Sequence, residues 1–276
     1  MARFQVQKFN IDASPFQCPH CRESLIFAEN SFTCSNKHCF DIASKGYVNL
    51  LPAQKPLKGY DREFFQNRRA FLDAGFYAHI LEGILSHTPK EAKFIVDAGC
   101  GEGYYAKHLQ DSTDATVFAF DISKDAIQIA ASGGNAVLWS VADLTRIPLA
   151  DHCADCLLNI FTPANYTEFH RVLKPGGTLL KVVPGAQHLK ELRSALQAHI
   201  RSESYSNEDV VSYFTQNFSH IERIPLCKTI PIDQEQQNAL LKMTPLAFNI
   251  EQEVLQNCHI DTITIDAELL IGQTEV

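Results

Sequence analysis

The chain has 276 residues, a formal net charge of −8 and 45% hydrophobic residues. This length is enough for one large domain and a small one, and the acidic charge argues against a protein whose whole surface binds nucleic acid. No apolar run reaches the roughly 18 residues of a membrane helix, and the N-terminal residues lack the apolar core of a signal peptide. The nine cysteines are odd in number and several lie in apolar stretches, which argues against a disulfide framework. We therefore expect a globular protein of the reducing cytoplasm with no membrane partner.

Residues with metal-binding side chains lie near the N-terminus in two close pairs. Cys18 and Cys21 form a C-x2-C pair, and after a 12-residue spacer Cys34 and His38 form a C-x3-H pair. Two such pairs separated by a short hairpin are the arrangement that a tetrahedral zinc site requires. Cys39 adjoins His38 and is an alternative fourth ligand. A segment this small buries little apolar surface, so metal binding would supply its folding energy.

Short strands are expected around these pairs. Residues 24–28 and 31–33 have the composition of two strands joined by a turn. Phe40 to Pro52, with its Lys-Gly-Tyr turn and short apolar run, is expected to form one more strand. Residues 53–60 contain Lys, Pro and Gly with little apolar content, which is typical of a linker. The sequence therefore predicts a zinc-binding module over 1–52, a linker over 53–60 and a larger domain over 61–276.

A local excess of positive charge runs from Lys45 to Arg69, where six basic residues accompany two acidic ones. Such a stripe on an acidic protein can contact phosphate, while the acidic remainder limits non-specific binding. An ordinary solvated linker and helix face would have the same composition. Within this stretch Arg62 to Gly75 has apolar residues at helical spacing, with Gly75 suited to end the helix.

The most informative stretch follows an apolar run, Phe94 to Val96, which is typical of a buried parallel strand. An acidic residue and a G-x-G-x-G loop follow the strand: Asp97, Gly99, Gly101 and Gly103, with Glu102 between the last two glycines. A strand, a glycine-rich turn and a helix form the nucleotide-binding corner of a doubly wound sheet. The dinucleotide fingerprint G-x-G-x-x-G would need glycine at position 104, where this chain has Tyr104.

This loop resembles the S-adenosylmethionine (SAM) loop of Rossmann-like methyltransferases. About twenty residues further on, a second apolar strand, Thr116 to Asp121, ends in an acid. A carboxylate at this place can accept hydrogen bonds from both ribose hydroxyls, so we expect Asp121 and the adjacent Ile122 at the cofactor. The alternative is a glycine-rich turn beside a coincidental aspartate.

The third and fourth strands are expected at 136–143 and 156–161. Asp143 ends the third strand, where methyltransferases often place a residue near the adenine amino group, although a simple turn aspartate fits equally well. Asn159 and Thr162 lie at the carboxyl end of the fourth strand, which faces the ligand crevice in doubly wound sheets. Contact of either residue with the target base is a hypothesis.

Three further strands are expected at 174–183, 221–232 and 260–271. They would complete a doubly wound, mostly parallel sheet of seven strands. The predicted fold class is therefore α/β, a Rossmann-like SAM methyltransferase fold with a small N-terminal zinc-binding β module.

Three longer motifs make the resemblance more specific. The zinc pairs are followed by F-D-x-A-x-x-G-Y-V-N-L-L-P, and further on come R-R-x-F-L-x-x-G-x-Y, ending at Tyr77, and P-G-x-x-H-L-x-E-L, which contains His188. Together they are similar to the 23S rRNA guanine-N1 methyltransferases. The resemblance implies that Tyr77 contacts SAM and that His188 borders its pocket. From composition alone, Tyr77 would be a core residue and His188 a cap.

The resemblance also implies zinc and SAM as cofactors, a zinc module that recognises RNA, and a homodimer whose cleft holds a hairpin of 23S rRNA. The predicted activity is SAM-dependent methylation of guanine N1 in that hairpin. Two alternatives stay open at this point: a SAM methyltransferase acting on a small molecule, and a zinc-containing RNA-binding protein that keeps SAM without turnover. No histidine or carboxylate in the sequence identifies itself as the general base.

Overall fold

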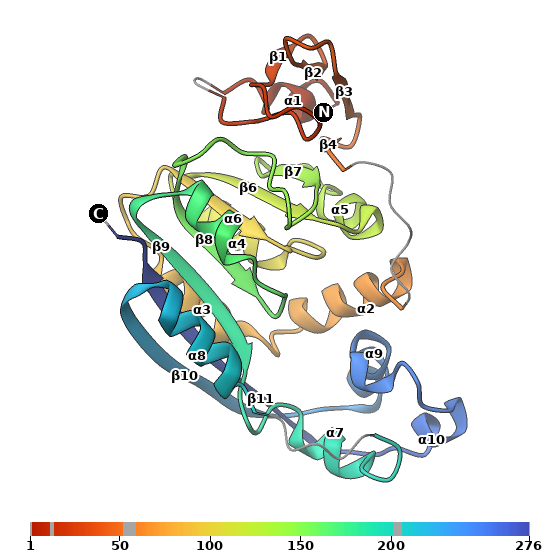
Figure 1. The fold of residues 1–276 in the computed structure, drawn as a ribbon. Helices are drawn as coiled ribbons and strands as arrows, with labels where there is room; N and C mark the ends of the chain where they lie inside the picture. The colour runs from red at the N-terminus through yellow and green to blue at the C-terminus, as the bar shows by residue number, and fades with distance from the viewer. Residues whose placement is uncertain (1, 12–13, 52–58, 201–205, 276) are drawn as a thin grey trace.

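We describe the fold from a computed structural model, in which residues 2–11, 14–51, 59–200 and 206–275 are placed (Figure 1). This part of the chain contains one sheet of eleven strands in the order β1-β2-β3-β4-β7-β6-β5-β8-β9-β11-β10. The strands are β1 (Ile26–Ala28), β2 (Ser31–Thr33), β3 (Cys39–Ala43), β4 (Tyr47–Asn49), β5 (Phe94–Ala98), β6 (Thr116–Asp121), β7 (Leu138–Val141), β8 (Ala154–Ile160), β9 (Leu173–Pro184), β10 (Ser219–Pro231) and β11 (Thr262–Gln273).

The seven strands β5 to β11 form the predicted Rossmann-like sheet, which confirms the fold class. Strands β7, β6, β5, β8 and β9 are parallel neighbours, and β11 runs antiparallel to both β9 and β10. The prediction of seven strands was too low for the whole sheet, because β4 pairs in parallel with β7 and extends it. Tyr47 lies opposite Trp139 in this pairing, and β3, β2 and β1 follow outward.

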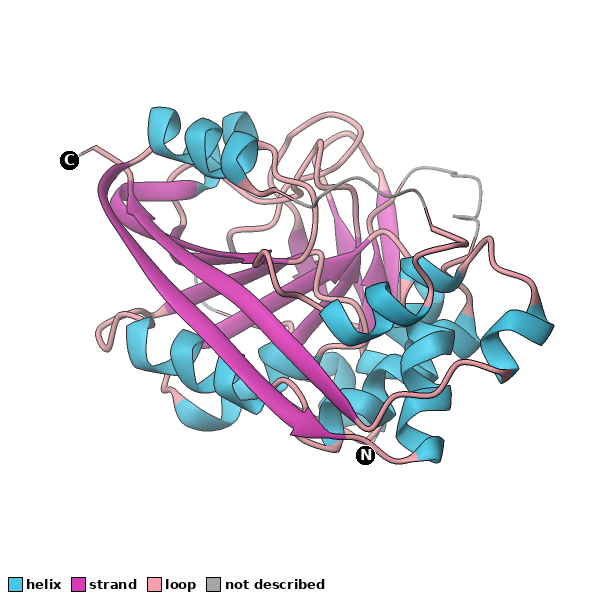
Figure 2. Ribbon diagram, turned by 90° about the horizontal axis from the view of Figure 1, so that it is seen from below, coloured by secondary structure: helices cyan, strands magenta, loops and turns pink. Residues whose placement is uncertain are grey.

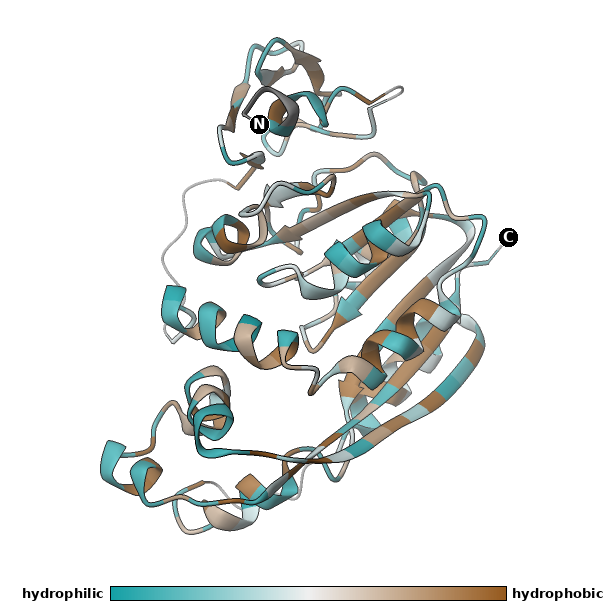
Figure 3. Cartoon of the chain, turned by 180° about the vertical axis from the view of Figure 1, so that it is seen from behind, coloured by the Kyte–Doolittle hydropathy of each residue, from teal (hydrophilic) through white to brown (hydrophobic). Residues whose placement is uncertain are grey.

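Helices cover both faces of the sheet (Figure 2). They are α1 (Ala2–Gln7), α2 (Arg62–Asp73), α3 (Ala78–His87), α4 (Tyr104–Ser112), α5 (Lys124–Ala130), α6 (Tyr166–Val172), α7 (Lys190–Ala195), α8 (Glu208–Asn217), α9 (Gln234–Met243), α10 (Gln252–Gln256) and the short 3-10 helix η1 (Pro245–Ala247). Side chains alternate between the faces along each strand, so Ile95 and Leu158 belong to one core, and Val96 and Leu157 to the other. The long outer strand β10 alternates between hydrophobic and hydrophilic residues (Figure 3).

The N-terminal module, residues 2–11 and 14–51, shares the second core. The rings of Phe9, Phe16 and Phe32 are fully buried in it, and Phe16 contacts Phe118 of β6 with the ring centroids 5.2 Å apart. The metal-binding part of the chain is therefore continuous with the large sheet through both backbone pairing and apolar packing.

Two expectations for the N-terminal part need comment. The Lys-Gly-Tyr turn expected between Phe40 and Pro52 is present at Gly46, with φ of +83°, and the described part of the segment has a strand on each side of it, β3 and β4, where one was expected. Residues 53–58 of the predicted linker lie outside the described residues, so the division into domains stays a prediction. In the described residues no helix has the length and apolarity needed to cross a membrane.

The shared core leads to a prediction about stability. Phe16→Ala should lower the free energy of unfolding by about 3–5 kcal/mol, because it removes a buried ring at the junction of module and sheet. Urea unfolding can be followed by the fluorescence of Trp139, the single tryptophan, which lies on β7 beside β4. Phe27→Ala, at a partly exposed ring of the same module, should cost much less. A Phe16→Ala protein as stable as the wild type at Trp139 would contradict a shared core.

Candidate cofactor cavity and metal centre

A cavity of about 800 Å³ lies at the carboxyl ends of β5, β6, β7 and β8. Its floor is formed by residues that follow these strands: Gly99, Gly101, Asp121, Ile122, Asp143 and Thr162. Its walls come from α2, from Tyr77 at the start of α3, from His188 after β9 and from the segment 243–246 after α9. Ligands bind at this edge of open α/β sheets because the loops diverge there.

The glycine loop needs glycine at each of its three positions. Gly99, Gly101 and Gly103 have φ of +82°, +56° and +83°, a region that L side chains rarely adopt. A Cβ on Gly99 would lie 2.8 Å from atoms of Thr162, and one on Gly103 would collide with Trp139. Gly101 is more open, with its nearest neighbour Phe65 at 3.8 Å from a Cβ. The close packing on both sides fixes the loop and leaves the space above Gly101 to a ligand.

Asp121 holds this loop from the end of β6. One carboxylate oxygen accepts a hydrogen bond from the Gly101 backbone N–H at 2.9 Å, and the other accepts one from Ser123 N–H at 2.8 Å. A carboxylate offers about four acceptor positions, so these bonds leave acceptor capacity toward the cavity that Asp121 lines. The geometry suits the predicted acceptance of two hydroxyl groups.

Negative charge exceeds positive charge around the loop. Glu102 is buried and pairs with Arg68 of α2, whose Nη1 lies 3.3 Å from Oε1. Asp97 is 1% exposed and its Oδ2 has no hydrogen-bond partner. Burial, and after it the nearby carboxylates Asp121 and Glu102, raise the pKa of Asp97 to about 7. A cationic ligand in this cavity would be attracted to three carboxyl groups that share one guanidinium.

Three rings pack together on the β9 side of the cavity. The ring centroids of Tyr77 and Phe161 are 5.8 Å apart, and those of Phe161 and His188 are 5.6 Å apart. Burial lowers the pKa of His188 to about 4, so the imidazole is neutral near pH 7. Its Nδ1 donates to the Asp266 carbonyl at 2.8 Å, which leaves Nε2 as the acceptor. Burial also raises the pKa of Tyr77 to about 12, so its hydroxyl keeps its proton.

The loop after β8 is held from below by a buried lysine. The Lys181 ammonium donates to Asn159 Oδ1 at 2.5 Å and to the Thr162 carbonyl at 3.2 Å. The Asn159 amide in turn donates to the Pro163 carbonyl at 3.0 Å and to the Ala98 carbonyl at 3.4 Å. In this arrangement Asn159 supports the loop from inside, and Thr162 is the residue that reaches the cavity.

The structure brings most of the predicted site residues to this one cavity. Eight of the twelve line it: Tyr77, Gly99, Gly101, Asp121, Ile122, Asp143, Thr162 and His188. The other four are buried in the wall behind it: Asp97, Glu102, Gly103 and Asn159. Asp143 meets both descriptions considered for it, because it lines the cavity and also accepts a turn hydrogen bond from Thr145 N–H at 2.8 Å. Their roles toward a ligand stay predictions.

Several cavity residues were not foreseen from the sequence. Phe64 and Phe65 were treated as the apolar face of a helix, but both line the cavity. Adjacent residues of a helix point about 100° apart. Two neighbouring phenylalanines therefore indicate that the apolar face of the helix is wider than the strip that packs on the core. Arg193 and Leu246 also line the cavity, and no local pattern marked them because distant segments bring them there.

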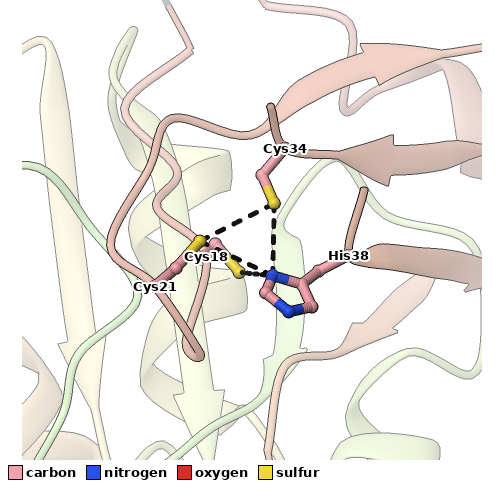
Figure 4. A group of neighbouring side chains, drawn as sticks. All are labelled: Cys18, Cys21, Cys34 and His38. Atoms are coloured by element: carbon pink, nitrogen blue, oxygen red, sulfur yellow. Dashed lines mark hydrogen bonds between the residues drawn. The ribbon is translucent and has the colours of Figure 1, made fainter. Parts of the chain in front are cut away.

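The four predicted zinc ligands form one group (Figure 4). Tetrahedral zinc with bonds of about 2.3 Å to sulfur and about 2.0 Å to nitrogen implies S–S edges of about 3.8 Å and S–N edges of about 3.5 Å. The Sγ atoms of Cys21 and Cys34 are 3.7 Å apart. The His38 Nδ1 atom lies 3.4, 3.5 and 3.3 Å from Sγ of Cys18, Cys21 and Cys34. This donor set fits zinc in both chemistry and dimensions.

Cys39 lies outside that group. Its side chain is exposed, and its sulfur accepts from the Thr33 hydroxyl at 3.7 Å. The backbone explains the difference, since Cys39 begins β3 and its neighbour His38 is the last residue of the turn that approaches the cysteines. The geometry therefore favours His38 as the fourth ligand.

Comparison with known proteins gives matches to both parts of the chain. Residues 16–56 match the zinc-ribbon family described as RlmA, N-terminal, and residues 95–177 match the family described as methyltransferase domain. The chain is 38% identical to a Bacillus subtilis protein named as the 23S rRNA (guanine-N(1)-)-methyltransferase YxjB, over 96% of this chain and 99% of that protein. It is 32% identical to the 23S rRNA (guanine(748)-N(1))-methyltransferase of Streptomyces fradiae, over 87% and 88% of the two chains.

Solved structures support the fold. A methyltransferase of Haloferax volcanii, in complex with the activator Trm112, superimposes with a TM-score of 0.54 at 18% identity, over 80% of this chain and 100% of that chain. A SAM-dependent methyltransferase of Thermotoga maritima gives a TM-score of 0.50 at 16% identity, over 77% and 98%. At these identities the similarity concerns the fold alone.

The metal group yields a prediction about zinc content. Cys34→Ser should reduce the zinc of the purified protein from about one ion per chain to nearly none, because a three-donor remnant no longer closes the tetrahedron. Cys39→Ser is the matched control and should keep the full zinc content. Metal analysis of both proteins tests this, and zinc loss in the Cys39 variant instead would reverse the assignment.

The raised pKa of Asp97 yields a prediction about pH. An unfolded aspartate releases its proton near pH 3.8, whereas folded Asp97 keeps its proton up to about pH 7. Raising the pH through this window therefore favours the unfolded state. In the cofactor-free protein Asp97→Asn should add up to about 4 kcal/mol to the free energy of unfolding at pH 8, and the gain should shrink toward pH 4.

Unfolding midpoints of both proteins between pH 4 and pH 8 measure this effect. The same substitution should weaken binding of a cationic cofactor, which calorimetry can test separately. A variant that is less stable than the wild type at pH 8 would contradict the prediction, because it would show that neighbouring groups stabilise the charged form of Asp97.

Proposed function

Because the chain belongs to the family of 23S rRNA (guanine-N1)-methyltransferases, we propose that it transfers the methyl group of SAM to N1 of a guanine in 23S rRNA. The cofactors are SAM in the cavity and zinc in the N-terminal module. In this proposal the zinc centre stabilises the fold of the N-terminal module, and methyl transfer takes place at the carboxyl ends of the sheet strands.

One observation carries the proposal. The similarity to the Bacillus subtilis relative extends over 96% of this chain, so it includes the Cys3His group and the glycine loop together. A shared methyltransferase domain alone would be compatible with many acceptors, since folds host unrelated functions. The N-terminal zinc ribbon is the part that distinguishes this family from small-molecule methyltransferases.

The cavity residues have clear roles toward the cofactor in this proposal. When bound, SAM supplies an electrophilic methyl group on a sulfonium, and the protein's task is positioning. We assign Asp121 to the ribose hydroxyls and Asp143 to the adenine end. The buried charges of Asp97 and Glu102 would favour the cationic methionine end. Tyr77 would close the cavity over it.

The guanine must be brought to this cavity with N1 exposed. N1 lies on the base-pairing edge, so the base has to be extruded or presented in an unpaired loop. Thr162 and the Nε2 atom of neutral His188 provide acceptors at the cavity wall. We assign Thr162, on the loop held by Lys181, to contact with the base, and Asn159 to support of that loop.

Three finer statements belong to the same proposal. We place the target guanine in a hairpin of 23S rRNA, the active form in a homodimer whose cleft holds that hairpin, and the protein in the cytoplasm. Family resemblance supports all three. Of the basic residues on α2, Arg68 lines the cavity and pairs with Glu102, whereas Arg62 and Arg69 contact residues on the α5 side of the helix.

Methyl transfer to separated acceptors tests the proposal. The purified protein with methyl-labelled SAM should label 23S rRNA, and reverse transcription should stop at one guanine because N1 methylation blocks pairing. Ribosomal subunits and a metabolite extract are the parallel acceptors. Label confined to metabolites would favour the small-molecule alternative, and SAM binding without transfer to any acceptor would favour a non-catalytic role.

The loop assignment gives a second test. Gly101→Arg should abolish SAM binding and methyl transfer, because the side chain would occupy the open space above the loop and its cation would repel the sulfonium. Zinc content should stay at the wild-type level, since the metal group lies in the N-terminal module. Calorimetry and metal analysis of the same preparation measure both, and full activity of this variant would refute the assignment.

A further inference from the structure

Two exposed aromatic side chains lie together beside the cavity. Tyr60 is 38% exposed and Phe248 is 36% exposed, and their ring centroids are 5.5 Å apart. Tyr60 also lines the cavity itself. The other large exposed hydrophobic side chains in the described residues are Ile26, on β1, and Val210 and Tyr213, on α8. Two of the three large exposed aromatic side chains in the described residues therefore lie beside the cavity.

These two rings end a continuous row of aromatic contacts that starts at the glycine loop. Phe65 lies over Gly101, and its centroid is 5.1 Å from that of Phe64. Phe64 contacts Tyr60 at 4.9 Å and Phe248 at 5.7 Å. The exposed fraction rises along the row, from 5% and 6% for the two inner rings to more than a third for the outer pair. The row connects the cofactor position to the protein surface.

The outer pair is held in place by the fold. Phe248 packs on the backbone of Gly59, where an added Cβ would lie 2.9 Å from its ring. It follows the 3-10 helix η1, and its backbone N–H donates to the Pro245 carbonyl. A salt bridge of 3.0 Å between Lys242 and Glu63 joins α9 to α2 beside it. Two segments far apart in the sequence thus build one rigid surface, which suits recognition of a flat ligand.

We propose that Tyr60 and Phe248 form a stacking platform for an unpaired base of the RNA substrate, next to the guanine that enters the cavity. This inference rests on the proposed function. A base that leaves its stack exposes the faces of its neighbours, and aromatic side chains recover that stacking energy without reading sequence.

Alanine variants test the platform. Tyr60→Ala and Phe248→Ala should each raise the dissociation constant for a 23S rRNA transcript by about 5- to 100-fold, the range expected for one lost stacked base. For Phe248→Ala the dissociation constant for SAM should change less than about twofold, because Phe248 is not among the residues that line the cavity. Tyr213→Ala is the matched control, since Tyr213 is 57% exposed on α8 and outside the cavity lining.

Two further variants distinguish loss of base stacking from loss of protein stability. Phe248→Trp should retain RNA affinity, because the indole keeps a flat face. Phe248→Leu keeps apolar contact with Gly59 and Phe64 but lacks that face, so it should lose affinity while its unfolding midpoint stays near the wild-type value. Equal RNA affinity of the leucine variant and the wild type would overturn the platform even if the alanine variants fold poorly.

The outcomes distinguish this inference from the function on which it rests. A wild-type protein that methylates 23S rRNA, with alanine variants that bind RNA normally, would overturn the platform alone. A wild-type protein that neither binds nor methylates RNA would overturn both. Sedimentation of the same variants adds one more outcome: a change in oligomeric state with unchanged RNA affinity would assign the pair to a contact between protein chains and refute base stacking.

Discussion

The parallel pairing of β4 with β7 is the interaction on which the arrangement of this molecule depends. It makes the metal-binding module part of the same sheet whose other strand ends form the cavity. A module joined to the sheet by the covalent chain alone would sample many orientations, and fixing it for binding would cost entropy. Backbone pairing and the Phe16–Phe118 contact remove that freedom in advance. The zinc ion then stabilises a surface whose position relative to the cavity is already fixed.

The charged groups around the cavity are buried, whereas most of the protein's charged groups lie on its surface. The protein carries a net charge of −8, yet three of its carboxyl groups surround the glycine loop, where burial raises the pKa of each. In the described residues the guanidinium beside them is that of Arg68, which forms its ion pair with Glu102. Burying carboxylates without a bound cation costs free energy, and a bound cation offsets this cost. An acidic protein can therefore bind a cationic cofactor such as SAM through negative charge that is concentrated at one site.

Much of this could be predicted from the sequence because the chemistry is local. The four zinc ligands are set by spacing within 21 residues of sequence, and the G-x-G-x-G loop by glycines that need positive φ. The β4–β7 pairing could not be predicted in this way, because Tyr47 and Trp139 are far apart in the chain and each segment alone is only a short apolar run. The contact between Phe248 and Tyr60 could not be predicted either. Packing of α9 against α2 brings the two residues together, and no periodic pattern in the sequence indicates it.

Two parts of the cavity wall have different properties: the loop after β8 is fixed by buried hydrogen bonds, and the aromatic row offers apolar faces. Strand β8 ends in a loop whose support is entirely buried, with Lys181 bonded to Asn159 and to the Thr162 carbonyl. A fixed loop lowers the cost of orienting a base in line with the methyl group. The aromatic row on the opposite wall offers faces without donors or acceptors that would discriminate between bases. In the proposed function the strand ends would orient the target base and the rings would contribute affinity for RNA, so a substitution of a ring should alter affinity and preserve the geometry of methyl transfer.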